Sequence, residues 1–469
     1  MLGRPVRRGR SLGSVSRGHP ETVPAGVKKP RCSYFGEDIL EIRKRRVVIT
    51  GMGIVAPNGH GLHEFETALR EGRSGIRFIQ QLKDLNFACQ IGGIPQDFEA
   101  VRKNYFDHEK IMSINDNIGY ASVSAVDAWR DAGFDIPAED SDVDWDSGVI
   151  VGSGIGGMDT IAEKVVPMVN QGMVRRLGSR IVEQVMNSGT SARIAGLLAL
   201  GNQVTSNSSA CSTGTEAIIE AMWRIRSGLA GRILAGGSEG ASPFIWSGFD
   251  AMRVIARKYN DRPQEASRPM SESANGFVPG SGGAILLLES LESALARGAR
   301  IYAEVLGGAV NCGGHRNGGS ITAPNPEGVR RCIRAAIADS GIEPGEIDAI
   351  NGHLTATFAD PAEVRNWSEA LGRGPESFPY INATKSMIGH CLGAAGAIES
   401  VGVVLQLYKG FLHPSLNCED LHPEILPFGD RIPRKMLDCP GLKTIAKAGF
   451  GFGDVNSCLI FRKWENSEK

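Results

Sequence analysis

A cysteine in a run of small polar residues is the first candidate for chemistry in this sequence. Residues 207–217 read NSSACSTGTEA, and the apolar residues that follow recur at helical spacing, so Cys211 is expected at the turn between a strand and a helix. The N–H groups and the dipole at a helix N-terminus favour the thiolate, which would lower the pKa of this cysteine and make it a nucleophile. Cysteines are also among the most buried residue types, so the motif alone leaves a packing role open.

Two of the nine histidines lie in surroundings that suit catalysis. His353 follows the strand-like residues 347–350 in the segment NGHLTAT and is expected to emerge at a strand end. His390 lies in GHCLGAAG, where small residues open a helical pattern. A single histidine is more often structural, but two of them together with a cysteine at a turn form a candidate catalytic constellation.

Two glycine-rich segments could form turns that bind a ligand. Residues 449–456 read GFGFGDVN, whose backbone amides could point at an oxyanion, although an ordinary hairpin explains the pattern equally well. Residues 152–157 read GSGIGG, which differs from the dinucleotide fingerprint in its glycine positions and has no acidic residue at the end of a following strand. We therefore expect no nucleotide cofactor at that second turn.

The elements that must position these residues alternate between strands and helices. Residues 45–53 (RRVVITGMG) and 148–154 (GVIVGSG) have the character of buried strands that end in tight turns. Residues 118–132 and 217–226 have helical periodicity. This alternation predicts an α/β protein.

We expect three segments along the chain. Residues 1–45 are a basic extension with five arginines and no acid in the first twenty positions; we expect it to be disordered, with an organellar transit peptide as the alternative. A charged, helix-like stretch near residues 291–300 separates two α/β halves. The first, 46–295, contains the cysteine, and the second, 296–465, contains both histidines.

The composition excludes several classes of protein. Lys and Arg (51) nearly balance Asp and Glu (52), so no overall basic field draws the chain to nucleic acid. The nine cysteines are scattered without Cys/His pairs at metal-ligand spacing, which argues against a disulfide framework and a zinc site. The sequence has no apolar stretch of about 18 residues and no apolar secretory segment at its N-terminus, so we expect neither a membrane span nor export.

Seven motifs, in the same order, resemble those of the elongating β-ketoacyl-acyl carrier protein synthases (types I and II) of the thiolase-like superfamily. They are VVITGMG, GSGIGG, ACSTG, GG.E with GF.A, RP followed by GFV.G.G, TKS..GH.LGAAG, and GFGFG..N, and they extend from about residue 46 to residue 461. The resemblance implies a duplicated five-layer α/β/α/β/α fold and a homodimer. It also implies decarboxylative condensation of malonyl-acyl carrier protein with a cysteine-bound acyl group, in fatty acid chain elongation.

The same resemblance implies the surroundings of that reaction. The substrates are carried on the phosphopantetheine of acyl carrier protein, which is the expected partner, and no metal or organic cofactor is needed. The expected location is the cytoplasm, or an organelle if residues 1–45 are a transit peptide.

The resemblance assigns roles residue by residue. Cys211 takes the acyl group, with its own amide and that of Phe452 as the oxyanion hole, and Phe452 also gates the acyl pocket. His353 and His390 donate hydrogen bonds to the enolate oxygen that forms as malonyl-acyl carrier protein loses carbon dioxide. The further positions that match are Lys385, which tunes the site electrostatically, Thr355 and Thr357, which hold the phosphopantetheine arm, and Asp360 and Glu363, which support the site.

Departures from the family pattern bear on the site. Leu354 stands where the family has a glycine, which is expected to rule out a backbone with φ > 0 there. Asp360 and Glu363 lie one residue closer to the first histidine than is usual, so the loop must be shortened and the role of Glu363 is less defined. Ser271 and Ser281 replace two acids of the family pattern, which leaves substrate preference open.

Alternatives remain at this point. A thiolase shares the fold, and Cys391 adjoins His390, but thiolases carry a second catalytic cysteine where this chain reads GFGFG; a starter-unit synthase would have asparagine in place of His390. A non-catalytic chain-length partner would lack the nucleophile. A synthase of a dedicated polyketide or polyene pathway is the main alternative to fatty acid elongation. Docking of an acidic carrier needs a local basic patch, for which the candidates are Arg102, Lys103, Arg175 and Arg176.

Overall fold

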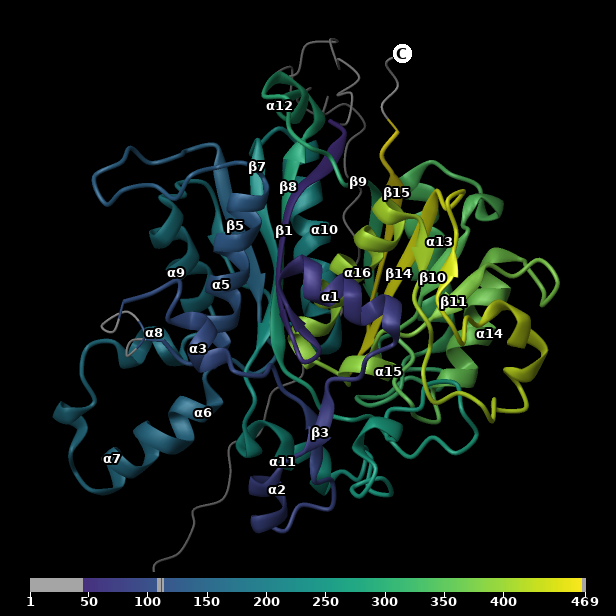
Figure 1. The fold of residues 1–469 in the computed structure, drawn as a ribbon, viewed down its shortest axis with the longest axis horizontal. Coiled ribbons are helices and arrows are strands. Elements are labelled where there is room, and N and C mark those ends of the chain that lie inside the picture. The colour runs from purple at the N-terminus through teal and green to yellow at the C-terminus, as the bar shows by residue number, and fades with distance from the viewer. Residues whose placement is uncertain (1–44, 108–110, 112–113, 466–469) are drawn as a thin grey trace, which may run out of the picture. The chain divides into compact units, whose positions relative to one another are not determined.

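The fold is built on one large mixed sheet. The computed structural model describes residues 45–107, 111 and 114–465, so the expected extension 1–45 lies outside the described residues except for Arg45. The sheet has eleven strands in the order β11-β10-β14-β15-β9-β1-β8-β7-β5-β6, with β2 paired to β1 (Figure 1). Its strands are β1 (Val47–Ala56), β2 (Gly59–His60), β5 (Ser147–Gly152), β6 (Val204–Thr205), β7 (Arg232–Glu239), β8 (Gly282–Ser290), β9 (Ala303–Cys312), β10 (Ala349–Asn351), β11 (Tyr380–Asn382), β14 (Thr444–Gly451) and β15 (Val455–Lys463).

The two halves of this sheet have the same topology. We call β6-β5-β7-β8-β1 the first half-sheet and β11-β10-β14-β15-β9 the second; numbered along the chain, both have the strand order 3-2-4-5-1. The pair directions match too, because the first two pairs are parallel and the last two antiparallel in each. A short antiparallel contact between β1 and β9 joins the halves. The duplication that the resemblance implied is therefore present in the strand order.

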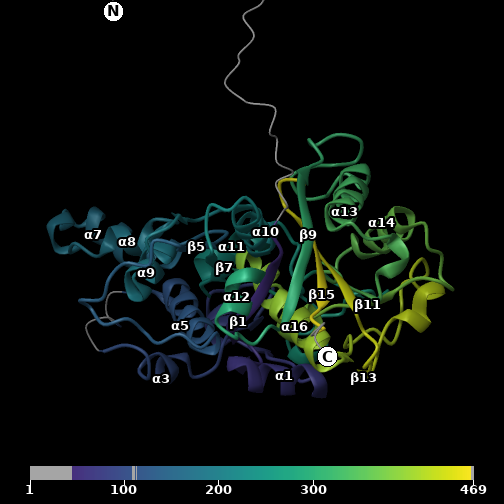
Figure 2. The same cartoon turned by 90° about the horizontal axis from the view of Figure 1, so that it is seen from above.

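Helices cover both half-sheets and fill the space between them. Helices α5 (Asp116–Asp131) and α9 (Gly189–Leu198) pack on the first half-sheet, and α13 (Pro326–Ser340) and α14 (Asp360–Leu371) pack near the second. Between them, α10 (Thr213–Arg226) and α16 (Ala395–Lys409) lie against each other (Figure 1, Figure 2). The arrangement gives the five expected layers.

The remaining elements lie at the ends of these layers. The shorter helices are α1 (Gly61–Glu71), α2 (Gln80–Asp84), α3 (Phe98–Arg102), α6 (Met158–Thr160), α7 (Val166–Asn170), α8 (Ile181–Val185), α11 (Pro243–Ala251), α12 (Leu291–Ala296) and α15 (Lys385–Ile388). Two small sheets pair β3 (Ile76–Phe78) with β4 (Ile91–Gly93) and β12 (Phe411–Leu412) with β13 (Leu437–Asp438).

The predicted elements are confirmed, and their boundaries have local causes. The strands expected at 45–53 and 148–154 are β1 and β5, and the helices expected at 118–132 and 217–226 are α5 and α10. Helix α5 begins where the side chain of Asn115 accepts the N–H of Ile118. Helix α1 ends where Gly72 adopts a left-handed backbone (φ 65°), which favours glycine.

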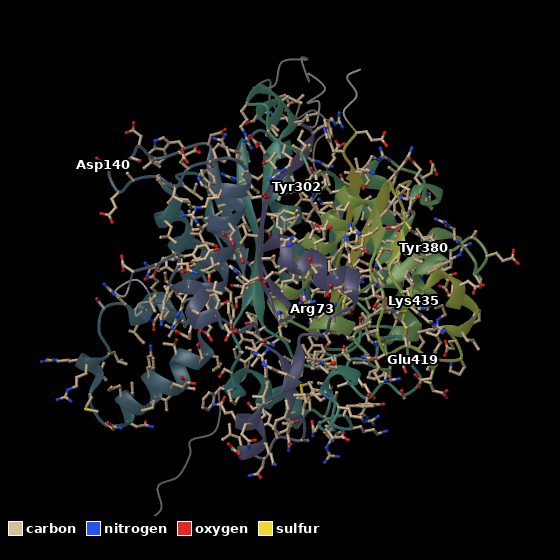
Figure 3. All side chains as sticks on the ribbon, viewed as in Figure 1. Arg73, Asp140, Tyr302, Tyr380, Glu419 and Lys435 are labelled. Carbon is tan, nitrogen blue, oxygen red and sulfur yellow. The ribbon has the colours of Figure 1, made fainter. Side chains whose placement is uncertain are left out.

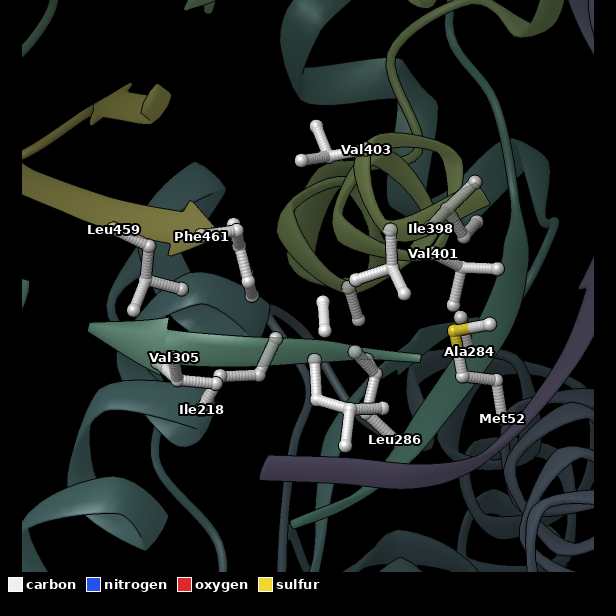
Figure 4. Packing of buried hydrophobic residues seen from close by; sticks show 14 of the residues in the cluster. Met52, Ile218, Ala284, Leu286, Val305, Ile398, Val401, Val403, Leu459 and Phe461 are labelled. Atoms are coloured by element: carbon white, nitrogen blue, oxygen red, sulfur yellow. The ribbon is translucent and has the colours of Figure 1, made fainter. Parts of the chain in front are cut away.

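The two central helices share an apolar core with both half-sheets. Ile218 of α10 and Ile398 and Val401 of α16 are fully buried and belong to one cluster with Leu286 of β8 and Phe461 of β15 (Figure 4). Almost all of α16 is buried, which is typical of a helix inside a large protein. The beginnings of α10 and α16 are thus held by packing from both half-sheets.

Charged side chains of both signs project from the surface. Figure 3 shows Asp140 and Glu419 together with Arg73 and Lys435 among them. Within the part of the chain that the structure describes, no helix is long and apolar enough to cross a bilayer.

Candidate active site

Three side chains from distant parts of the chain meet in one place. The sulfur of Cys211 and a ring nitrogen each of His353 and His390 lie within 4.8 Å of one another. The cysteine comes from the turn before α10, His353 follows β10, and His390 lies between α15 and α16. The structure therefore brings together the constellation that the sequence predicted.

The cysteine lies at a turn whose backbone conformation is fixed by local hydrogen bonds. After β6, a short 3₁₀ helix (Ala210–Ser212) leads directly into α10, as expected. Ala210 has a left-handed backbone with φ 50°, an unfavourable conformation for a residue other than glycine. The hydroxyl of Thr213 accepts the N–H of Ser209 (2.9 Å) and donates to the carbonyl of Ala210 (2.7 Å), which fixes the turn.

The protonation of Cys211 differs from the sequence expectation. Burial raises the pKa of its thiol to about 11, against the opposing effects of the Phe452 N–H and of Lys385. The expected lowering by the helix N-terminus is wrong for the free site, because the loss of water outweighs it. The thiol proton must therefore leave as the sulfur attacks.

His390 is held in one tautomer. The backbone N–H of Leu392 donates to its Nδ1 (3.2 Å), so the proton of the neutral ring sits on Nε2, which lies 3.0 Å from the sulfur of Cys211. Burial, followed by the charges of Lys385 and Lys447, holds the pKa of His390 well below its usual range. The ring is thus neutral and acts as a hydrogen-bond donor toward the cysteine.

His353 is positioned through its backbone. The carboxylate of Glu363, on α14, accepts the N–H of His353 (2.6 Å) and the N–H of Leu354 (2.7 Å). Burial raises the pKa of Glu363 to about 7, while these N–H groups oppose the rise. Burial and then Lys385 hold the pKa of His353 well below its usual range, so this ring is neutral as well.

The expectation about Leu354 is wrong. Its φ is 21° and that of Ala356 is 63°, so the loop adopts positive φ without glycine. Asp360 accepts the N–H groups of Thr355 (2.9 Å) and Ala356 (3.1 Å), in addition to the bonds made by Glu363. The two carboxylates together impose this backbone, and the buried Leu354 side chain belongs to an apolar cluster that includes Val364 and Trp367 of α14.

The other hydroxyls and acids that the resemblance assigned to the site line the cavity. The hydroxyls of Thr355 and Thr357 lie 3.0 Å apart and line the cavity beside Cys211. Asp360 also accepts the N–H of Met270 (2.9 Å), and burial raises its pKa to about 6. The loop after His353 is therefore held in place by two buried acids.

The glycine-rich turn contacts the cysteine directly. Phe452 lines the cavity, and its N–H is hydrogen-bonded to the Cys211 thiol. Gly451 lies so close that a Cβ there would stand 3.0 Å from the Cys211 nitrogen. The hydroxyl of Ser212 donates to the carbonyl of Gly449 (3.0 Å). The turn is thus attached to the cysteine, with two backbone amides available for an oxyanion.

A buried charge cluster lies behind the site. Lys385 and Lys447 pair with the two oxygens of one carboxylate, Glu399, and Lys447 lies 2.7 Å from it. All three side chains are at most 2% exposed. Sequence reasoning found Lys385 and missed the other two, whose only signal was a charged residue inside an otherwise apolar strand or helix pattern.

The site opens into a cavity of about 540 Å³. Phe249, Phe277 and Leu392 line it, with the ring of Phe277 5.3 Å from that of His390, and the 82% exposed Phe358 lies at its mouth. The cavity is also lined by the exposed Arg253 and Arg257. The predicted docking residues Arg102, Lys103, Arg175 and Arg176 are not among the residues that line it.

The two serine departures and the neighbouring cysteine lie off the cavity. Ser271 donates to Asp420, and Ser281 donates to the carbonyl of Gly93 (3.5 Å). Cys391 is fully buried in the apolar core, and burial strongly raises its pKa, so it offers no second reactive thiol. None of the eight cysteines in the described residues forms a disulfide.

The three meeting side chains are of types that also bind metals. A metal would need the lone pair of Nε2 on His390, but the N–H that Leu392 donates to Nδ1 keeps a proton on that atom. The donor set therefore fits proton and hydrogen-bond chemistry better than metal binding.

Family models match most of the chain. One described as "Beta-ketoacyl synthase, N-terminal domain" matches residues 44–294, and one described as "Beta-ketoacyl synthase, C-terminal domain" matches residues 302–419. The chain is 36% identical over 422 residues to 3-oxoacyl-[acyl-carrier-protein] synthase I, chloroplastic, of Arabidopsis thaliana, covering 89% of this chain and 86% of the relative. It is also 36% identical over 420 residues to 3-oxoacyl-[acyl-carrier-protein] synthase 1 of Escherichia coli K12, covering 89% and 99%.

Solved structures share the fold. A β-ketoacyl synthase from Burkholderia phymatum superposes with a TM-score of 0.82 at 30% identity, covering 90% of this chain and all of that one. A type II polyketide ketosynthase, solved in complex with its acyl carrier protein, superposes with a TM-score of 0.79 at 29% identity and the same coverage.

Proposed function

Because this chain belongs to the β-ketoacyl synthase family, we propose that it is the condensing enzyme of fatty acid elongation: it joins a cysteine-bound acyl group to malonyl-acyl carrier protein with loss of carbon dioxide. The observation that carries the proposal is the donor Nε2–H of His390 3.0 Å from the Cys211 sulfur, with His353 beside it, in an apolar cavity. The family's acyltransferase chemistry needs this combination of a thiol nucleophile and hydrogen-bond donors.

The first step is transfer of the acyl group. The sulfur of Cys211 attacks the thioester carbonyl of an acyl-carrier substrate, the new S–C bond forms, and the carrier thiol leaves with the proton that the cysteine loses. The amides of Cys211 and Phe452 receive the negative charge on the carbonyl oxygen. Donors placed where charge develops are worth about 3–4 kcal/mol in such reactions.

The second step makes the carbon–carbon bond. Malonyl-acyl carrier protein loses carbon dioxide, and the electrons of the broken bond form an enolate whose oxygen takes hydrogen bonds from His353 and His390. The enolate carbon attacks the acyl carbonyl, the bond between that carbonyl and the sulfur breaks, and Cys211 leaves as the thiolate, which then takes a proton from water. Both rings are suited to this role because burial keeps them neutral.

The supporting residues act through position and charge in this proposal. Thr355 and Thr357 hold the phosphopantetheine arm, Lys385 adds positive charge behind the histidines, and Asp360 and Glu363 hold the loop that carries His353. Loss of carbon dioxide supplies the carbon nucleophile, so we propose that no metal or organic cofactor takes part.

The partner is acyl carrier protein. The ketosynthase solved with its acyl carrier protein supports this, and Arg253 and Arg257 at the cavity give an acidic carrier a basic contact next to the pantetheine path. We propose these two in preference to the candidates Arg102, Lys103, Arg175 and Arg176, which do not line the cavity.

The proposed assembly is a homodimer. Strand β6 lies at an edge of the sheet, where Val204 is 40% exposed. Large apolar side chains nearby in the sequence are also exposed; they are Val166, Val169, Val174, Val182 and Met186. An open strand edge with exposed apolar groups is suited to pairing with a second copy. Sedimentation at several concentrations tests this.

The proposed location is the cytoplasm, with an organelle as the alternative. Bacterial relatives support the first, and the Arabidopsis relative named chloroplastic supports the second.

Intact-protein mass spectrometry tests the function. Purified protein is mixed with acyl-acyl carrier proteins of several chain lengths and then with malonyl-acyl carrier protein. We expect an acyl mass on the peptide with Cys211 that is discharged as a ketoacyl product. A substrate preference for polyketide intermediates would favour the polyketide or polyene pathway. No adduct with any carrier substrate would favour the non-catalytic partner role and contradict the proposal.

A further inference from the structure

Lys447 is a buried lysine in the strand that leads to the glycine-rich turn. It is 1% exposed in β14, where it pairs with Leu459 of β15 and Asn351 of β10. A lysine is almost never this buried unless it has a partner, because its charge loses water. Its position therefore calls for an explanation within the protein.

The explanation lies in how Glu399 is shared. One oxygen of its carboxylate pairs with the ammonium group of Lys385, and the other lies 2.7 Å from the ammonium nitrogen of Lys447. Lys447 also donates to the carbonyl of Ala448 in its own strand. Two ammonium groups thus share the negative charge of one carboxylate. The positive charge of Lys385 is therefore only partly neutralised.

The surplus positive charge faces both histidines. Beyond burial, the charge of Lys447 acts with that of Lys385 to lower the pKa of His353 and of His390. The other ionisable groups around the rings are Glu363 on α14, Asp360 at its start, Glu399 on α16 and the thiol of Cys211. Glu363 also lies close enough to Lys447 to oppose the effect of burial on the pKa of that lysine.

Neutral rings matter for the proposed chemistry. Protonation of His390 at Nδ1 would oppose the N–H of Leu392, which now donates to that atom, and the ring would have to turn away. A positive charge that the protein holds in place disfavours this protonation of the ring. It also stabilises the negative charge on the enolate oxygen.

We infer that Lys447 is a positioning residue for the condensation. By pairing with one oxygen of Glu399, it leaves a net positive charge on the two lysines and this carboxylate, beside the two catalytic histidines. This inference rests on the proposed function. None of the seven sequence motifs includes Lys447.

The test is the pH profile of malonyl-acyl carrier protein decarboxylation in Lys447→Gln. Glutamine keeps a donor for the carboxylate or the Ala448 carbonyl but removes the charge. Lys447→Met, which is apolar and close in length, serves if the glutamine variant does not fold. The control is Lys443→Gln, which removes the same charge from the exposed residue just before β14.

We expect the acid limb of the profile to move to higher pH in the Lys447 variants and to stay in place in the control. Relative to the rate at pH 8, the rate at the acid end of the profile should fall further in the Lys447 variants than in the unaltered enzyme. A loss of rate that is equal at every pH, in a variant that still takes an acyl group on Cys211, would show a purely structural role and overturn the inference. If the unaltered enzyme itself neither takes an acyl group nor releases carbon dioxide, the proposed function fails and the inference falls with it.

Discussion

The pH dependence of stability at Glu363 follows from its geometry. This carboxylate accepts two backbone N–H groups, from His353 at 2.6 Å and from Leu354 at 2.7 Å, yet it is only 7% exposed. Burial raises its pKa from the ordinary 4.5 to about 7 despite those bonds. The perturbation is Glu363→Gln, which has nearly the same shape and cannot ionise.

The sign of the effect follows from which state holds more protons. Between about pH 4.5 and pH 7 the folded protein keeps the Glu363 proton and the unfolded chain loses it, so the free energy of unfolding falls as the pH rises. A rise in pKa from 4.5 to about 7 corresponds to about 3 kcal/mol. Glu363→Gln lacks this decrease in the free energy of unfolding. Asp360 titrates together with Glu363 and changes the difference between the two proteins in the same direction.

The assay is urea unfolding of both proteins at pH 5 and pH 8. We expect the free energy of unfolding of the unaltered protein, minus that of Glu363→Gln, to be about 2–4 kcal/mol smaller at pH 8 than at pH 5. Glu369→Gln, an exposed position on the same helix that binds Arg330, should show no such change. A difference that stays constant or grows with pH would falsify the view that burial governs this carboxylate.

Three further predictions concern the reaction. Cys211→Ala should give no acyl adduct by mass spectrometry but keep some release of carbon dioxide from malonyl-acyl carrier protein, because both histidines remain; loss of both activities in a folded variant would argue against separate roles. His390→Ala should lower that release by about 10²-fold or more yet still permit acylation of Cys211, since its Nε2 is a donor and not a base; if acylation vanishes instead, His390 activates the thiol. The double variant Arg253→Glu, Arg257→Glu should raise the KM for carrier-bound substrates about tenfold or more at low salt. The KM for acyl groups on free pantetheine should change little. An equal rise in KM with both substrates would show that these arginines act on the substrate in the cavity and not in carrier docking.

The sequence predicted the elements well because their signals are local. The β-branched run that forms β1 and the helical spacing after Cys211 are fixed by neighbours in the chain. The two histidines were also found, since each follows a recognisable strand or precedes a recognisable helix. Their meeting with the cysteine needed the order of the sheet, which the resemblance supplied.

What the sequence missed depends on partners that are distant in the chain. In the sequence, Lys447 is a single charged residue in a strand pattern. Only the fold shows that Glu399, on α16, partly neutralises its charge. The pKa of Cys211 was expected to fall because a helix begins there, but burial from the surrounding loops raises it. Arg253 and Arg257 were overlooked since nothing local distinguishes an arginine at a cavity from one elsewhere on the surface.

The error about Leu354 has the same origin. Positive φ costs a residue with a side chain about 1–2 kcal/mol, so the sequence argued against it. Two short hydrogen bonds to Glu363 and two to Asp360 act on this loop, and hydrogen bonds to charged groups contribute about 1.5–3 kcal/mol each. The contacts from α14 therefore outweigh the local preference.

The duplication explains why the site lies where it does. In each half, a helix follows the third strand of the half-sheet, and these two helices, α10 and α16, cross at their beginnings. The crossing is very close: a Cβ on Gly214 would lie 2.6 Å from the nitrogen of Ala397, and one on Gly396 would lie 2.5 Å from that of Thr215. Only glycine at both positions permits it. The glycines of ACSTG and LGAAG thus do no chemistry themselves, but they let Cys211 and His390 approach to 3.0 Å.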